Sequence, residues 1–226
     1  MKKLIIAFLI ILSSVATYAQ NGDVGLFAGS SYYTGDLNPG TPFKNSLPAF
    51  GAFYRYIFNN RLAIKAGYST TTLQSNDFQI GRGLSFSTKL NEISAQLEVN
   101  FAEFGIGPNE KQVSPYIFGG IGHTWFTARL ESSGSPQGDP LQADVTSLPF
   151  GLGVKFMPVE NVSIGLEWGL RKTVGRNADK IDLVYEPGVR VSNANDWYAF
   201  AGFWISFRLN FFSGERCEEL RSVNKH

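Results

Sequence analysis

The sequence predicts an all-β protein: an eight-stranded antiparallel transmembrane β-barrel with a filled polar lumen and a short C-terminal periplasmic tail. Three observations predict this class. An export signal precedes a chain that contains no second long apolar run. Apolar and polar residues alternate in eight segments. The links between these segments differ in length along the chain, which is typical of barrels with short periplasmic turns and long outer loops.

The first twenty residues, MKKLIIAFLIILSSVATYAQ, have the order of a secretory signal peptide. Lys2 and Lys3 precede an apolar run from Leu4 to Leu12, and small residues lead to Ala19. The run is too short for a spanning helix, which needs roughly 20 residues. We expect cleavage after Ala19, so that the chain divides into a signal peptide (1–19), a barrel (20–212) and a periplasmic tail (213–226).

Candidate strands follow from the two-residue period of the apolar residues. They lie at 23–32, 49–58, 61–71, 85–103, 115–129, 146–157, 161–173 and 196–211. The first and the fifth carry apolar residues on both faces. The fourth is the cleanest, because its apolar row opposes a polar row without exception: Ile93, Ala95, Leu97, Val99 and Phe101 against Glu92, Ser94, Gln96, Glu98 and Asn100.

Alternation alone fits two barrels. A soluble, lipocalin-like barrel would place the apolar row inside, whereas a membrane barrel would turn it toward lipid. Glycines on the opposite face favour the membrane barrel, because a solvent-facing surface gains nothing from them and a crowded lumen has room for little else. These glycines are Gly51, Gly67, Gly151, Gly153, Gly165, Gly169 and Gly202.

Charged side chains on the glycine-bearing faces would then lie inside the barrel. An eight-stranded barrel is just wide enough for side chains to fill, so we expect a salt-bridged plug and no conducting pore. The expected members of this ion-pair network are Arg55, Lys65, Glu92, Glu98, Lys155, Glu167, Arg171 and Arg208.

The links predict which end of the barrel faces which compartment. Asn59-Asn60 and 158–161 are tight turns, and 104–114 is intermediate. Four longer segments rich in Gly, Ser, Asn, Asp and Pro read as loops: 33–48, 72–84, 130–145 and 174–195. If consecutive strands are antiparallel neighbours, the long loops share the outer end. Both termini then lie in the periplasm.

Several function classes lack their sequence signals. A formal net charge of +1 without a basic run gives no reason to propose nucleic acid. The acids Asp139, Asp144, Asp179 and Asp182 do not match a calcium loop, and FGGIGH lacks the helix that a nucleotide fingerprint requires. No GxSxG or HExxH motif occurs, and His123 is the one histidine inside a candidate strand. We expect no cofactor, metal, small-molecule substrate or enzymatic activity.

Cys217 is the single cysteine and follows the last candidate strand in the tail SGERCEELRSVNKH. It cannot form a disulfide within one chain. Two interpretations stay open: an inert thiol in a disordered tail, or an intermolecular disulfide formed in the oxidising periplasm.

Seven segments, taken in order, resemble the PorG-type outer-membrane component of the Bacteroidota type IX secretion system. They are GSSYYTGDLNP (29–39), PAFGAFYRYIFNNRLAIKAG (48–67), NEISAQLEVNF (91–101), SPYIFGGIG (114–122), LPFGLGVKF (148–156), IGLEWGLRKT (164–173) and NDWYAFAGF (195–203). The resemblance spans nearly the whole mature chain.

The resemblance implies an outer-membrane barrel that is not the translocon. Such barrels are associated with a periplasmic ring built from the lipoprotein PorK and its partner PorN, and they are needed for cargo export. The family's cysteine after the barrel corresponds to Cys217 and implies a covalent link to the lipoprotein. Two alternatives remain: an OmpX-like barrel whose outer loops bind surfaces, and a lipid-modifying enzyme that uses His123.

Overall fold

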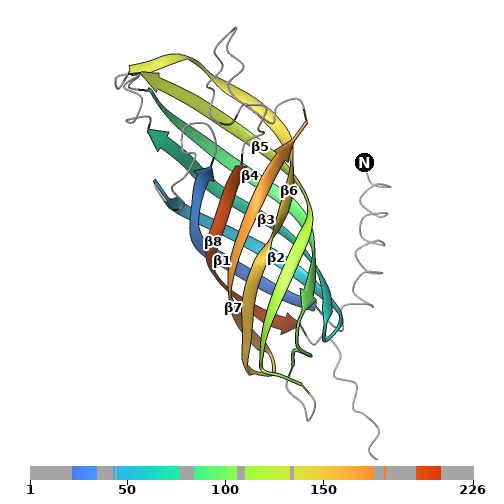
Figure 1. The fold of residues 1–226 in the computed structure, drawn as a ribbon. Helices are drawn as coiled ribbons and strands as arrows, with labels where there is room; N and C mark the ends of the chain where they lie inside the picture. Colours follow the sequence, from blue (N-terminus) through green and yellow to red (C-terminus); the bar gives the residue numbers. More distant parts are fainter. Residues whose placement is uncertain are drawn as a thin grey trace, which may run out of the picture.

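Eight antiparallel strands close into one barrel in the computed structural model (Figure 1). The structure describes residues 22–34, 43, 45–76, 84–105, 110–132, 135–175, 181 and 197–209. The strands are β1 (Gly22–Thr34), β2 (Leu47–Asn59), β3 (Leu62–Asn76), β4 (Leu84–Asn100), β5 (Val113–Ser132), β6 (Ser135–Val159), β7 (Val162–Val174) and β8 (Trp197–Leu209). Each strand pairs with the next, and β8 pairs with β1. The predicted fold class is confirmed.

The barrel has two different ends. The turn end contains the start of β1, the end of β8, and the β2–β3 and β6–β7 connections, which are two residues long. Asn59 stabilises the first of these turns, because its Oδ1 accepts hydrogen bonds from the backbone N–H groups of Arg61 and Leu62, each at 2.9 Å. The loop end contains the end of β1 and the start of β8. The two tight turns predicted from the sequence are confirmed.

The prediction of a loop at 130–145 is wrong, because most of these residues belong to β5 and β6. β5 runs to Ser132 and β6 starts at Ser135, and these two residues pair. Gly138 and Pro140, which suggested a loop, fall at an irregularity where the register shifts opposite the Ala128–Leu130 stretch, and Pro136 pairs with Glu131 near the end of the hairpin. Proline cannot donate to a ladder but is tolerated at such bulges. As a result, β5 and β6 project beyond the other strands at the loop end (Figure 1).

The alternating face of β4 shows which side of the sheet is apolar. Leu97 is 47% exposed on the outside, whereas Glu98 is fully buried inside. Large apolar side chains cover the outer surface of every strand, among them Leu26, Phe50, Ile64, Ile93, Leu97, Ile117, Leu152, Leu166, Phe203 and Phe207. Soluble monomers rarely expose an apolar patch above a few hundred Å². The barrel therefore spans a membrane with this belt against lipid, and the soluble, lipocalin-like interpretation is wrong.

Glycine is required where two pairs of strands meet on the lumen side. Gly29 of β1 pairs with Gly202 of β8, and Gly151 of β6 pairs with Gly169 of β7. A Cβ atom on Gly202 would lie 2.5 Å from Gly29 Cα, and one on Gly29 would lie 2.6 Å from Gly202 Cα. These positions have no room for a larger residue, which agrees with the crowded lumen expected from the sequence.

Candidate functional site

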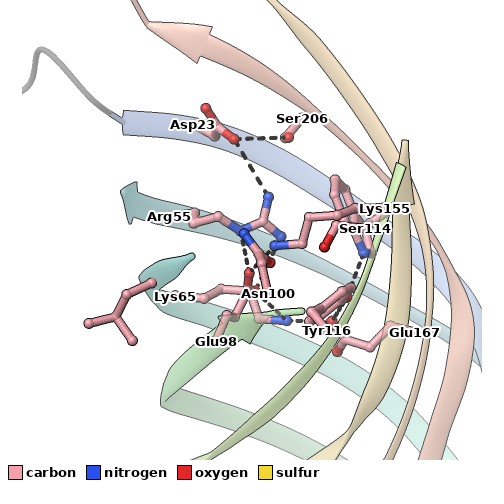
Figure 2. A network of polar contacts seen from close by, with 12 residues as sticks. Asp23, Arg55, Lys65, Glu98, Asn100, Ser114, Tyr116, Lys155, Glu167 and Ser206 are labelled. Atoms are coloured by element: carbon pink, nitrogen blue, oxygen red, sulfur yellow. Dashed lines mark hydrogen bonds and ion pairs between the residues drawn. The ribbon is translucent and has the colours of Figure 1, made fainter. Parts of the chain in front are cut away.

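The Glu98 carboxylate lies inside the lumen and contacts three cationic side chains, those of Arg55, Lys65 and Lys155 (Figure 2). Its Oε2 atom is 2.9 Å from Arg55 Nε and 2.8 Å from Lys155 Nζ. Its Oε1 atom accepts a hydrogen bond from Arg55 Nη2 at 3.2 Å and lies 3.6 Å from Lys65 Nζ. Glu98 has no solvent exposure, so these cations replace the water that an ionised carboxylate requires.

Glu167 extends the network toward β5 and β8. Its Oε2 atom is 2.6 Å from Lys65 Nζ and accepts a hydrogen bond from Tyr116 OH at 2.9 Å. Tyr116 OH in turn accepts a hydrogen bond from Trp204 Nε1 at 3.0 Å. Lys65 therefore bridges Glu98 and Glu167, and the chain of contacts crosses the lumen (Figure 2).

Asp23 joins the network at the turn end with longer contacts. Its carboxylate is 3.6 Å from Arg55 Nη1 and 3.5 Å from Arg208 Nε, and Ser206 Oγ donates to it at 3.5 Å. Ideal charge-assisted hydrogen bonds are about 2.7–2.9 Å long. Asp23 is thus held more loosely than Glu98.

Every strand contributes to this central network. The members are Asp23 from β1, Arg55 from β2, Lys65 from β3, Glu98 from β4, Tyr116 from β5, Lys155 from β6, Glu167 from β7, and Trp204, Ser206 and Arg208 from β8. The backbone ladder joins only neighbouring strands, whereas these side chains join strands across the lumen. The network therefore stabilises the closed barrel as a unit.

Glu92 forms a second cluster closer to the loop end. Its Oε2 atom accepts hydrogen bonds from Tyr198 OH at 2.6 Å and from Ser147 Oγ at 3.1 Å. Arg171 Nε is 3.6 Å from Glu92 Oε1, and Thr124 Oγ1 lies 2.9 Å from Tyr198 OH. All of these side chains are buried, so this cluster is a second polar layer across the lumen.

Aromatic rings fill the space around the cations. Arg55 lies over Trp204 with its Cζ atom 4.4 Å from the ring centroid, and Lys155 Nζ is 4.3 Å from that of Tyr116. Arg171 Cζ is 4.4 Å from the Phe200 ring. Such cation–π contacts are strongest when water is excluded. The lumen is therefore occupied by paired charges and rings.

The loop end of the lumen is apolar, a feature that the polar lumen expected from the sequence did not include. Ile181, from the β7–β8 connection, is fully buried, and its backbone oxygen accepts a hydrogen bond from Thr88 Oγ1 at 2.6 Å. The surrounding cluster consists of Tyr33, Ala49, Leu73, Phe86, Leu90, Phe126, Ala128, Val145, Tyr198 and Phe200. These side chains close the loop end above the two polar layers.

The predicted network residues do not all occupy the same environment. Glu98 collects Arg55, Lys65 and Lys155, while Glu92 and Arg171 form the separate cluster. Arg208 is the most exposed of the eight, with 28% of its side chain accessible at the turn end.

Sequence reasoning missed Asp23, Tyr116, Tyr198 and Trp204 as members of the network. Asp23 is identified by the register of the barrel, in which it pairs with Arg55 across β1 and β2. The two tyrosines and Trp204 lie on the polar faces of their strands but carry no charge that would mark them.

Two other candidate residues lie outside the lumen or outside the described part of the chain. His123 is exposed on the outer surface, where its ring centroid is 6.2 Å from that of Trp125. It thus points away from the Ser and Glu side chains of the lumen. Cys217 and the tail around it lie outside the described residues, as do the signal segment and most of the loop 174–195.

The described ranges lack both a metal-binding group and a membrane-spanning helix. They hold no group of three or more His, Cys, Asp or Glu side chains placed to bind a metal ion. Within the same ranges, no helix is long and apolar enough to cross a membrane.

Solved structures share the barrel fold at low sequence identity. The chain is similar to Neisserial surface protein A, with 14% identity and a TM-score of 0.52 over 83% of this chain and 97% of that chain. It is also similar to Ail, the attachment invasion locus protein of Yersinia pestis, with 18% identity and a TM-score of 0.50 over the same shares. At these identities the likeness shows the fold alone. No curated protein sequence matches the chain.

A family model matches almost the full length of the sequence. The match covers residues 2–217, which include all eight strands and the position of Cys217. The chain therefore belongs to the family described as Domain of unknown function (DUF6089).

Proposed function

We propose that this protein is a non-enzymatic outer-membrane barrel that anchors the periplasmic ring of the type IX secretion system. Its partners in this proposal are a PorK-like lipoprotein, a PorN-like protein and the outer-membrane lipid. The turn end, the N-terminus and the tail after β8 face the periplasm, as is usual for barrels with short turns on that side.

The observation that carries the proposal is the filled lumen. Two polar layers around Glu98 and Glu92 and an apolar cluster around Ile181 occupy the interior in succession. Breaking a buried ion pair costs about 3–5 kcal/mol, so solutes have no low-energy path through these layers. A barrel without a passage acts through its ends and its surfaces, which is what an anchor requires.

The sequence segments behind the type IX resemblance also build this lumen. NEISAQLEVNF supplies Glu92 and Glu98, IGLEWGLRKT supplies Glu167 and Arg171, and NDWYAFAGF supplies Tyr198. A resemblance concentrated in buried residues is more informative than one in lipid-facing residues, since any apolar residue satisfies lipid. This supports a shared interior with the PorG-type barrels.

The placement of His123 favours a non-enzymatic barrel. A general base must lie within hydrogen-bond reach of the group that it deprotonates. His123 faces lipid beside Trp125, and the acids of the lumen are held by cations and hydroxyl groups. His123→Ala should leave both barrel folding and the lipid composition of the outer membrane unchanged.

Purification from native membranes under non-reducing conditions tests the anchor. The wild-type protein should copurify with a lipoprotein in a crosslinked species that reductant dissolves, and Cys217→Ser should remove that species. A wild-type monomer under both conditions would exclude the covalent link. Absence of ring proteins from a mild-detergent preparation would exclude the anchor itself.

One observation favours surface binding as a second candidate function. Residues 135–145 of β6 pair with β5 on one side and with no described strand on the other. An unpaired strand edge can accept a strand from another protein. If the protein is an OmpX-like surface-binding barrel, shortening this hairpin should abolish cell-surface attachment and leave ring assembly intact.

A further inference from the structure

A cavity of about 240 Å³ opens at the turn end of the barrel. It lies beside the central network and the β2–β3 turn, with the exposed residues Phe58 and Asn59 at its rim. The residues that line it include Asp23, Arg55, Asn100, Phe104, Lys155 and Arg208. A water molecule occupies about 30 Å³ of liquid, so the cavity has room for a side chain of several heavy atoms.

The cavity wall carries more positive than negative charge. Arg55, Lys155 and Arg208 line it together with one carboxylate, that of Asp23. Glu98 lies deeper and already binds Arg55 and Lys155. Among the described residues, Arg208 contacts a carboxylate only through Nε, at 3.5 Å from Asp23. Its guanidinium therefore keeps donors for an additional anion.

Asn100 also lines the cavity, beside the β2–β3 turn. Its Nδ2 atom donates a hydrogen bond to the backbone oxygen of Asn60 at 2.9 Å, which fixes the orientation of the amide group. Its Oδ1 atom is buried and has no hydrogen-bond partner among the described residues, and Asn100 is 6% exposed. The hydrogen bond to Asn60 therefore holds Asn100 in the wall and joins the cavity to the β2–β3 turn.

We propose that this cavity is a carboxylate-binding site that takes an acidic side chain of a periplasmic polypeptide. Arg208 binds the carboxylate, with Lys155 adding positive charge. The proposal rests on the proposed function only for the orientation that turns this end toward the periplasm. The site provides a contact surface for a partner that is independent of Cys217.

The same carboxylate chemistry has a second source in the chain itself. Glu215, Glu218 and Glu219 follow β8, which ends at this end of the barrel. An experiment on the site must therefore separate an added polypeptide from these three side chains. Because the test uses the purified full chain without ring proteins, its failure is distinguishable from failure of the secretion assignment.

Calorimetric titration of the folded full chain in detergent micelles tests the site with two blocked amino acids. N-acetyl-aspartate N-methylamide supplies both a carboxylate and N–H groups, and its asparagine counterpart supplies the N–H groups alone. A charged hydrogen bond contributes about 1.5–3 kcal/mol, so the aspartate probe should bind at least about tenfold more tightly. Equal binding of the two probes would overturn the proposal.

Two arginine variants locate the site. Arg208→Gln should lower the affinity for the aspartate probe about tenfold, which corresponds to the loss of one charged hydrogen bond. Arg61→Gln is the matched control, because Arg61 lies at the same end but pairs with the exposed Glu103 at 3.4 Å. The control should bind as the wild type does. Equal weakening in both variants would show a diffuse charge effect and overturn the site.

A third variant identifies the source of the carboxylate. In Glu215→Gln/Glu218→Gln/Glu219→Gln, unchanged probe affinity supports a site that is free for a partner. Probe binding that appears only in this variant rejects the partner and assigns the chain's own tail as the occupant. No binding in either chain overturns the carboxylate site.

Discussion

Glu98 and Lys155 form an ion pair of 2.8 Å between β4 and β6, two strands that are separated in the sheet by β5. Neither side chain is more than 2% exposed. The pair thus links strands that share no ladder hydrogen bonds, inside a barrel whose outer surface is apolar. The lumen therefore requires particular residues at particular positions, whereas the lipid-facing surface requires only apolar ones.

Glu98→Gln should destabilise the barrel strongly. The substitution leaves Arg55, Lys65 and Lys155 without their common carboxylate, and breaking a buried pair costs about 3–5 kcal/mol. Urea unfolding in lipid vesicles measures the change. Glu103→Gln is the control, because the exposed Arg61–Glu103 pair contributes at most about 1 kcal/mol. Equal stability of the two variants would contradict the central role of Glu98.

Tyr116→Phe should lower the free energy of unfolding by about 1–3 kcal/mol, because it removes a hydrogen-bond partner from each of two buried groups. The hydroxyl donates to Glu167, which would keep its contact with Lys65, and accepts from Trp204 Nε1, which would lose this acceptor in the buried interior. Tyr68→Phe is the matched control, since Tyr68 OH donates to Asn91 on the exposed outer surface. Tyr68→Phe should change the free energy of unfolding by no more than about 0.5 kcal/mol. Similar destabilisation in both variants would contradict the role of Tyr116 in the lumen network.

Gly202→Ala should destabilise the β1–β8 seam by about 1–3 kcal/mol, the cost of overpacking. The new methyl group would be forced against Gly29 Cα. Gly119→Ala is the control, because a Cβ atom there meets no atom within 4 Å. That variant should be neutral or slightly more stable, since alanine loses less backbone entropy. Unfolding curves of the two variants give the comparison.

The purified barrel should show no steady conductance in a planar bilayer. Buried side chains around Glu98, Glu92 and Ile181 occupy the lumen, in contrast to the wide lumen of porins with 16–18 strands. Single-channel recording over a range of voltages measures this. Long-lived ohmic openings by the pure protein would contradict the filled lumen.

Alternation in the sequence was sufficient to predict most of the strand residues and to separate the two faces of the clean strands, but it did not decide which face contacts lipid. In β4 the polar and apolar rows are unbroken, so Glu98 could be placed inside before any contact was known. Glycine on the lumen faces added the crowding that decided between lipid and water outside. Both signals depend on the alternation of side chains along one strand, so they can be recognised in the sequence without knowledge of tertiary contacts.

Other features depend on contacts between distant segments and left no local signal. Ile181 packs in the apolar cluster at the loop end, and its backbone oxygen accepts a hydrogen bond from Thr88, 93 residues away in the chain. The early part of β6 contains Pro136 and Pro140 and resembles a loop, yet pairing with β5 makes it a strand. Asp23 is at the edge of a strand with apolar residues on both faces, so its partnership with Arg55 requires the barrel register.

Quenching of tryptophan fluorescence by brominated lipid tests most directly which face of the sheet contacts lipid. Two single-tryptophan proteins are compared. The first retains Trp204 in the lumen and has the other three native tryptophans changed to Phe. The second carries Leu97→Trp on the outer face and has all four native tryptophans changed to Phe. Leu97 is 47% exposed and Trp204 is 1% exposed. Brominated acyl chains should quench the tryptophan at position 97 strongly and leave Trp204 almost unchanged. Strong quenching of Trp204 with none at position 97 would contradict the membrane barrel.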